Sequence, residues 1–365
     1  VNVVSDKPLA GVVTFGGVVG LAGVGDSQPT TNGFRAPIET NSALGINTGT
    51  AVTNLGSENV TVNLQLCDSN GQVIASAQIE LPRMGHAAQF VNEVLWDQAV
   101  DFSDFLGLSK VTAEGSLAAT GIQARPGEFV TLPIAPTFIG DLSTSSSQPV
   151  STLPAQAAEL EEKLYFAQFG DGDGLFSQIV LMNLDDSMEA GARIVLKNDN
   201  GEPLAVDLNG AQVTGELDVV VPAGGIRTFR TDGEGDLPVG SVTVCSNKRL
   251  AGVILFAGAF GVAGVGSSEE QPLGFLAPVE ADDENKINTG IAAVNLENEE
   301  VTVELQLCNP EGQVLATTQI VLPAMGHRAR FVNELAWDPA ADLTDSRGLL
   351  KATVAVATAT PKAHT

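Results

Sequence analysis

The sequence predicts an all-β protein made of tandem antiparallel β-sandwich modules of two alternating, related types, with little helix. Three observations support this fold class. Long stretches of sequence recur at a fixed spacing, short segments alternate apolar and polar residues as half-buried strands do, and turns rich in Gly, Asn and Asp separate these segments. The 365 residues suffice for about three sandwiches of roughly 100 residues each.

A long internal repeat sets the order of the modules. Leu9-Ala-Gly-Val returns at Leu250, 241 positions later, and the match then continues without a gap. At the same offset VTVNLQLC at Val60 returns as VTVELQLC at Val301. A weaker repeat inside this period, seen in IVLMNL at Ile179, relates two module types, which we name A and B. We therefore predict closing strands of a partial A-type module at 1–31, a B-type sandwich at 32–140, a linker at 141–163, an A-type sandwich at 164–271 and a B-type sandwich lacking its last strand at 272–365.

The strands are predicted from period-two alternation. In Val60–Cys67 the four apolar residues point to one face, while Thr61, Asn63, Gln65 and Cys67 point to the other. Asp68-Ser-Asn-Gly71 supplies a turn, and the next strand is Gln72–Leu81. The best helix candidates are Asn92–Trp96 with its copy Asn333–Trp337, and Ala155–Lys163.

Charge excludes several partners. The chain has 18 Lys and Arg against 44 Asp and Glu, a formal net charge of −26. A nucleic acid or an anionic membrane surface needs clustered basic residues, so we expect neither as a partner. The longest uncharged apolar run, Leu9–Val24, is shorter than a membrane span and rich in Gly, so we expect buried strands there and no membrane insertion. The acidic, Lys-poor composition favours an extracellular or cell-surface location.

The sequence offers little chemistry for catalysis. Three His and three Cys are present without the spacing of a transition-metal site. No nucleophile elbow, phosphate-binding loop or dinucleotide-binding motif occurs. We therefore expect no enzyme activity, no catalytic residue and no organic cofactor.

One acidic turn is a candidate metal site. Asp171 and Asp173 lie two residues apart in the Gly-rich turn FGDGDGLF, and Ca²⁺ prefers such carboxylate oxygens. The alternative is a solvated acidic turn, because the full EF-hand pattern is missing. Asp282–Glu284 is a weaker candidate, since its counterpart Asn41–Ala43 has no carboxylate.

The histidines and cysteines have structural interpretations. His86 and His327 occupy equivalent positions before Phe-Val-Asn-Glu, and we expect strand ends there with Asn92 and Glu93 capping a short helical turn. The cysteines are predicted to be small, partly buried thiols. The alternative is a cross-link between modules or subunits, which would involve Cys67, Cys245 and Cys308.

These motifs are similar to a known kind of repeat. The order NTGxAxxNL, LCDSNGQV, LPxxGHxxxFVNE resembles the immunoglobulin-like β-sandwich repeats of large bacterial secreted surface proteins, and FGDGDGLFSQIVLMNL resembles the module that alternates with them. The resemblance covers nearly the whole chain. It implies tandem extracellular immunoglobulin-like modules and carries no catalytic residues.

The broken repeats suggest a function. Closing strands without a module body, and a last sandwich without its final strand, would expose apolar surface that neighbouring subunits or repeats must cover. We expect self-association and predict a structural subunit or repeat segment of an extracellular filament, stalk or surface layer, assembled head to tail, with β-strand complementation through residues 1–31. The alternatives are an adhesin-type binding module and an accessory region of an enzyme. The predicted interface residues are Leu9, Val12, Val13, Phe15, Val18, Val19, Leu21 and Val24.

Overall fold

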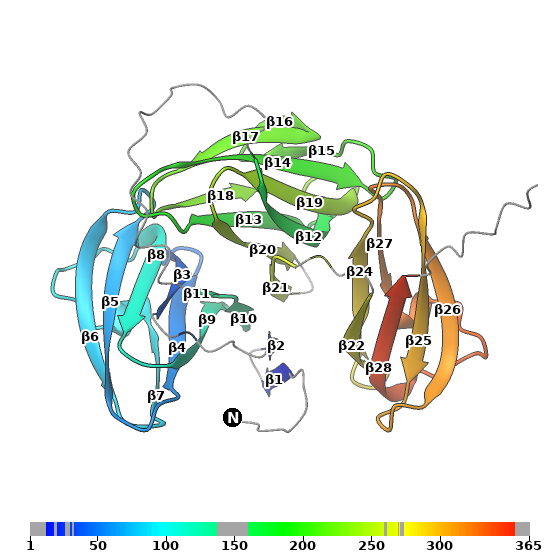
Figure 1. Ribbon diagram of the computed structural model, residues 1–365, viewed down its shortest axis with the longest axis horizontal. Helices are drawn as coiled ribbons and strands as arrows, with labels where there is room; N and C mark the ends of the chain where they lie inside the picture. Colours follow the sequence, from blue (N-terminus) through cyan, green and yellow to red (C-terminus); the bar gives the residue numbers. More distant parts are fainter. Residues whose placement is uncertain are drawn as a thin grey trace, which may run out of the picture.

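The computed structural model confirms an all-β chain (Figure 1). It describes residues 33–136, 160–258, 261–268, 270 and 274–354, together with Thr30 and the backbone of 12–17 and 20–25. Every sheet in these ranges is antiparallel, and no sheet joins strands of more than one of three modules. We call them the first module (33–136), the second module (160–270) and the third module (274–354).

The first module is a sandwich of two sheets. One has five strands in the order β11-β3-β8-β5-β6, and the other has four in the order β10-β9-β4-β7. Their facing side chains form the core around Phe34, Val62 and Val111. The strands are β3 (Gly33–Asn41), β4 (Asn47–Asn54), β5 (Val60–Asp68), β6 (Val73–Leu81), β7 (His86–Phe90), β8 (Asp104–Ala113), β9 (Leu117–Arg125), β10 (Glu128–Leu132) and β11 (Ala135–Pro136).

The second module repeats this topology and adds a hairpin. Its sheets have the orders β12-β19-β14-β17 and β18-β13-β20-β21, and the added hairpin pairs β15 with β16. The hairpin contributes Val206, Leu208 and Val213 to the module core. The strands are β12 (Glu162–Gly170), β13 (Phe176–Asn183), β14 (Ala190–Asn198), β15 (Ala205–Leu208), β16 (Ala211–Thr214), β17 (Glu216–Val221), β18 (Ile226–Arg230), β19 (Val239–Ser246), β20 (Leu250–Gly258) and β21 (Gly261–Gly266).

The third module reproduces the first at the offset of the sequence repeat. Its five-stranded sheet has the order β23-β22-β28-β25-β26, which matches the first module strand for strand except at the β23 edge, and β24 pairs with β27. The strand predicted to be missing from this module falls outside the described residues. The strands are β22 (Gly274–Asp282), β23 (Ile287–Asn288), β24 (Gly290–Val294), β25 (Val301–Cys308), β26 (Val314–Leu322), β27 (His327–Phe331) and β28 (Asp345–Val354).

The N-terminal strands form a hairpin of their own. β1 (Val12–Gly17) pairs with β2 (Gly20–Gly25), and Val12 lies opposite Gly25. Val253 lies opposite Gly266 between β20 and β21, so the two hairpins share one register at the repeat offset. Of the predicted interface residues, Val12, Val13 and Phe15 lie in β1, Leu21 and Val24 lie in β2, and Leu9, Val18 and Val19 fall outside the described residues.

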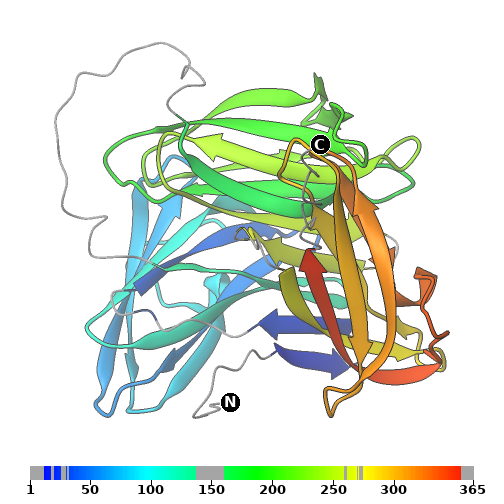
Figure 2. The ribbon, with the colours of Figure 1, turned by 45° about the vertical axis from the view of Figure 1, so that its right-hand side comes forward.

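The modules form an arch around the closing strands. Figure 1 shows the first module at one foot, the second across the top and the third at the other foot, with β21, β10 and the β1–β2 hairpin between them. β10 lies against both β2 and β21. The rotated view in Figure 2 shows the same stack of yellow, teal and dark blue strands. The last strands of successive units therefore contact one another in chain order.

The helix predictions need correction. In place of a helix at Asn92–Trp96 the structure has a single 3-10 turn, η1 (Val91–Glu93), and the third module has its copy, η4 (Val332–Glu334). The backbone N–H of Phe90 donates to Glu93, so Glu93 caps this turn as expected, whereas the Asn92 side chain bonds Asn47 instead.

The predicted helix Ala155–Lys163 is wrong where it can be judged. Residues 155–159 fall outside the described residues, and Glu162 and Lys163 begin strand β12, where they pair with Ser246 and Cys245 of β19. Pairing with β19 and the burial of Phe166 in the module core override the helix propensity of this segment.

Candidate functional site

Two β-turns meet wherever one module joins the next. The turn after β5, β14 or β25 is here called the leading turn, and the turn before β7, β18 or β27 the receiving turn. The leading turn of the first module packs on the receiving turn of the second, and the same pairing joins the second module to the third. The leading turns are Asp68–Gly71, Asn198–Gly201 and Asn309–Gly312. The receiving turns are Pro82–Gly85, Pro222–Gly225 and Pro323–Gly326.

A buried asparagine holds each receiving turn in place. The side-chain amide of Asn183 donates to the carbonyl oxygens of Met188, Val221 and Pro222, and its side-chain oxygen accepts from the backbone N–H of Asp185. Asn54 and Asn295 make the same four bonds in their own modules. Because a buried amide must be satisfied, this network fixes the turn relative to the sandwich.

The receiving turns share an unusual backbone conformation. The third residue of each has a positive φ: 54° at Met84, 57° at Gly224 and 54° at Met325. The fourth residue donates its N–H to the proline carbonyl, as in a type II turn. A methionine in this region has a conformational cost, and the asparagine network compensates for it.

The leading turns are fixed by their own first side chain. Asp68 accepts hydrogen bonds from the N–H groups of Asn70 and Gln72, and Asn198 accepts the equivalent pair. Gly71 and Gly201 follow at φ 81° and 79°. The side chain and the glycine together expose the carbonyl oxygen of the second turn residue, Ser69 or Asp199, toward the next module.

The two turns dock through backbone contacts. The backbone N–H of Ile226 donates to the carbonyl oxygen of Ser69 at 3.0 Å, and the Arg227 guanidinium donates to the same oxygen at 3.1 Å. A Cβ on Gly71 would collide with the carbonyl oxygen of Ala223, and a Cβ on Gly225 would lie 2.7 Å from that of Ser69. Glycine is therefore required at both positions for the turns to approach.

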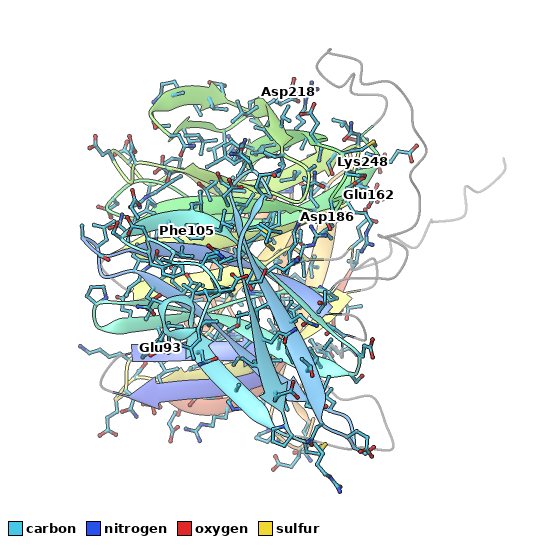
Figure 3. The ribbon with its side chains drawn as sticks, turned by 90° about the vertical axis from the view of Figure 1, so that its left-hand side faces the viewer. Glu93, Phe105, Glu162, Asp186, Asp218 and Lys248 are labelled. Carbon is cyan, nitrogen blue, oxygen red and sulfur yellow. The ribbon has the colours of Figure 1, made fainter. Side chains whose placement is uncertain are left out.

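The contact between the first and second modules is here called the first joint, and the contact between the second and third modules the second joint. A buried arginine adds a polar anchor to the first joint. Arg35, only 4% exposed, donates to the carbonyl oxygen of Asn183 at 2.8 Å and to the Asp186 carboxylate at 2.9 Å. Lys110 pairs with the other oxygen of Asp186. Figure 3 shows Asp186 where the strands of the first module reach the second. A buried cation needs such partners, so the anchor also specifies the docked geometry.

An apolar cluster fills the remainder of the first joint. Cys67 and Leu108 of the first module are fully buried against Met182, Ile226 and Val253 of the second. The predicted alternation of β5 is confirmed, because Val60, Val62, Leu64 and Leu66 are buried. Cys67 is buried as well, although it points to the polar face, since the second module covers that end of the strand.

The second joint repeats the first and adds a histidine. The backbone N–H of His327 donates to the carbonyl oxygen of Asp199 at 3.2 Å, and Arg328 donates to it at 2.7 Å, as Ile226 and Arg227 do with Ser69. The His327 ring, 0% exposed, contacts the Asp199 carboxylate through Nδ1 at 2.7 Å. Its Nε2 lies 3.1 Å from Gln168.

Burial decides the charge of His327. The contact with Asp199 favours the imidazolium, but burial of the ring, with Arg328 nearby, lowers the His327 pKa below its usual value of 6.5. Burial outweighs the contact because no part of the side chain reaches solvent. The joint therefore holds a neutral imidazole at neutral pH.

Acidification should loosen the second joint. A lowered folded-state pKa means that the unfolded or undocked state binds the proton more tightly, so the stabilisation is complete above pH 6.5 and is lost as the pH falls through the lowered pKa. We expect the thermal midpoint of the third module to fall between about pH 7.5 and 5.5, and to fall less in His327→Gln. Calorimetry of both proteins at the two pH values is the measurement. Equal pH dependence in both would contradict the assignment.

The two carboxylates of the predicted calcium turn differ in burial and in hydrogen bonding. Asp171 is buried and accepts the N–H of Gly233 at 2.9 Å, which ties its turn to the loop before β19. Asp173 is exposed, at φ 53°. In the described part of the chain no three His, Cys, Asp or Glu side chains are grouped as metal ligands. The Ca²⁺ site, and the weaker one at Asp282–Glu284, stay predictions.

The three cysteines are free thiols. Cys67 and Cys308 are buried, and Cys245 is half-buried on β19. Burial raises the pKa of the Cys67 and Cys245 thiols above the usual value, which reduces their thiolate content. A cross-link through these residues stays a prediction.

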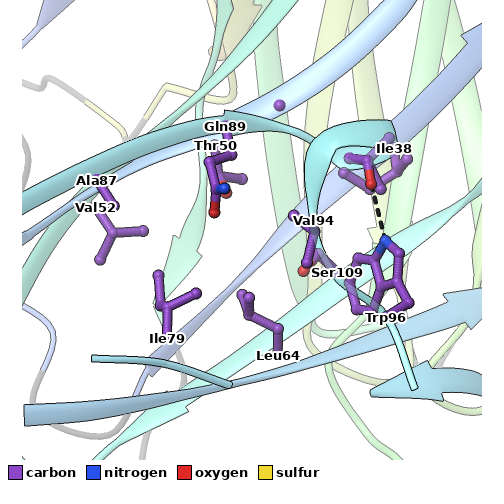
Figure 4. Close-up of a pocket in the computed structure, with 12 residues that line it drawn as sticks. Ile38, Thr50, Val52, Leu64, Ile79, Ala87, Gln89, Val94, Trp96 and Ser109 are labelled. Atoms are coloured by element: carbon purple, nitrogen blue, oxygen red, sulfur yellow. Dashed lines mark hydrogen bonds between the residues drawn. The ribbon is translucent and has the colours of Figure 1, made fainter. Parts of the chain in front are cut away.

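The cavities are packing gaps or open grooves. The one in Figure 4 lies between the sheets of the first module, has a volume of about 20 Å³ and is lined by apolar side chains such as Leu64 and Trp96. That is room for about one water molecule. The Trp96 indole N–H, drawn with its bond, donates to the Val91 carbonyl. A larger open groove beside Tyr165 contains the Tyr165–Glu270 hydrogen bond.

The docking residues could have been found in part from the sequence. The asparagine in TAVTNL, IVLMNL and IAAVNL recurs in all three modules, which marks Asn54, Asn183 and Asn295. No pattern marks Arg35, because its counterpart at the repeat offset is Leu276.

Comparison of the sequence with protein-family models and with curated proteins found no match to this chain. Within the described residues, no helix has the length and apolar character that crossing a membrane requires. The function is therefore inferred from the geometry of the joints.

Proposed function

We propose that this chain is a structural protein, a segment of an extracellular filament, stalk or surface layer in which β-sandwich modules are joined head to tail, without catalytic activity. The observation that carries the proposal is that one joint is made twice. The backbone carbonyl oxygens of Ser69 and Asp199 occupy equivalent positions, and each accepts hydrogen bonds from an equivalent backbone N–H and an equivalent arginine of the following module. A joint that repeats between successive modules builds length without a new interface at each step.

Two further features fit this role. The joint between the first and second modules uses buried hydrogen bonds and apolar packing, and the joint between the second and third buries the His327 ring against Asp199. The net charge of −26 repels neighbouring copies, so contacts along the chain are favoured over lateral aggregation. The proposed modules are immunoglobulin-like, alternate in type and are secreted to the cell surface, as the sequence resemblance implies.

Electron microscopy of the protein at near-neutral pH, with and without a chelator, tests the proposal. We expect regular filaments or curved rods whose axial repeat matches a few modules. Loss of filaments in chelator would indicate bridging cations. Removal of residues 1–25 should abolish assembly if these strands complete a neighbouring sandwich. Dispersed single particles at all concentrations would contradict self-assembly.

A further inference from the structure

The receiving turn of the first module has the structure of a docking face but is not covered by a leading turn in the described residues. Met84 has the same φ as Met325, and Asn54 makes the same bonds as Asn295. Met84 is nevertheless 50% exposed, and His86 is exposed where His327 and Ile226 are fully buried. His327 and Ile226 are buried because the leading turns at Asp199 and Ser69 cover them.

A hairpin already lies beside β10, at the other edge of the sheet that contains β7. β10 contacts both β2 and β21, and the β1–β2 hairpin has the register of β20–β21 at the repeat offset. An element with the pairing of the second module's closing hairpin therefore lies beside the first module. Where β10 contacts β21, the leading turn of the first module meets the receiving turn of the second, so a module whose closing hairpin contacts β10 is placed to meet the Pro82–Gly85 turn in the same way.

The chemistry of the face selects the leading turn that fits it. The turn opposite Ile226 carries Ser69, whereas the turn opposite His327 carries Asp199, whose carboxylate contacts the ring. His86 repeats His327, so it matches a turn with aspartate at this position. The third module has Pro310 there, and its leading turn cannot supply the carboxylate.

We propose that the Pro82–His86 face of the first module is the docking site for the Asn-Asp-Asn-Gly leading turn of a module with the sequence of the second module, whose aspartate contacts the His86 ring. This inference rests on the proposed head-to-tail function and names the partner of one free face. Ala87 stands where Arg328 donates to Asp199, so this joint has one donor fewer than the joint between the second and third modules.

An extended chain tests the proposal. Val1 corresponds to Val242 at the repeat offset, so residues 160–241 placed directly before Val1 complete a module ahead of the intact 365-residue chain. Diethyl pyrocarbonate labels accessible histidines, and mass spectrometry reports each site. We expect labelling of His86 to fall about tenfold or more in the extended chain, which corresponds to an opening free energy of about 1.4 kcal/mol. His327 should be protected in both chains.

The matched control is the extended chain with Asp199→Ala in the added copy only, which should restore much of the His86 labelling. Hydrogen exchange shows whether the added module is folded. A folded added module with unchanged His86 labelling would overturn the proposal. An unfolded added module would also contradict the proposal. The second module has the same sequence and is folded against the third module, so the first module would then have failed to supply the equivalent contacts. Filament images of the unextended chain test the proposed function separately.

Discussion

Gly201→Ala should open the joint between the second and third modules. Gly201 has a φ of 79°, and a Cβ there would collide with the carbonyl oxygen of Ala324 in the receiving turn. Backbone atoms cannot move aside as a flexible side chain can, so the turns must separate. We expect His327 to become reactive to diethyl pyrocarbonate and the radius of gyration measured by X-ray scattering to increase.

Gly312→Ala is the matched control. Gly312 occupies the same position in the third leading turn at φ 80°, and a Cβ there would have no neighbour within 4 Å. Both variants carry the cost of alanine in the left-handed region, about 1–2 kcal/mol, but only Gly201→Ala adds the collision. If His327 stays protected in both, or becomes reactive in both, the turn contact does not hold the joint.

Asn183→Ala should destabilise the second module strongly and release the first joint. The substitution removes the donor to the Met188 and Val221 carbonyl oxygens and the acceptor for the Asp185 N–H, while the Pro222 carbonyl keeps its bond from the Gly225 N–H. Unsatisfied buried groups cost about 1–3 kcal/mol each, and partial rescue by water gives an expected loss of about 3–4 kcal/mol of unfolding free energy. Hydrogen exchange at the Ile226 amide, which bonds Ser69, measures the joint directly.

Asn54→Ala separates the two effects of Asn183→Ala. Asn54 makes the same bonds, but its receiving turn has no leading turn against it in the described structure. We expect a similar loss of stability in the first module with the Ile226 amide still protected. Protection of this amide in both variants would show that the asparagine stabilises its module without positioning the turn.

The sequence was informative about local structure. Alternation in Val60–Cys67 predicted the strand and its buried face, because a strand with one buried face repeats every two residues, and Asp68-Ser-Asn-Gly71 predicted the turn. The helix at Ala155–Lys163 failed at Glu162 and Lys163, since their pairing with β19 depends on residues about 80 positions away. Helix propensity depends on the local sequence alone and cannot predict pairing with a distant strand.

The docking site was largely hidden because burial there depends on a neighbouring module. His86 and His327 share their sequence context, yet one is exposed and the other is 0% exposed. Cys67 lies at the end of a polar strand face and is buried by residues more than 100 positions away. Arg35 bonds Asn183 and Asp186, which lie about 150 positions away along the chain, so no local sequence pattern predicts these contacts.

Histidine labelling of the unaltered chain tests the central claim most directly. If leading turns dock on receiving turns, diethyl pyrocarbonate should modify His86 readily at neutral pH and leave His327 unmodified, although both follow a Met-Gly pair before the same strand. Equal modification of His86 and His327 would contradict the account, because the second and third modules would then not be joined as the structure has them.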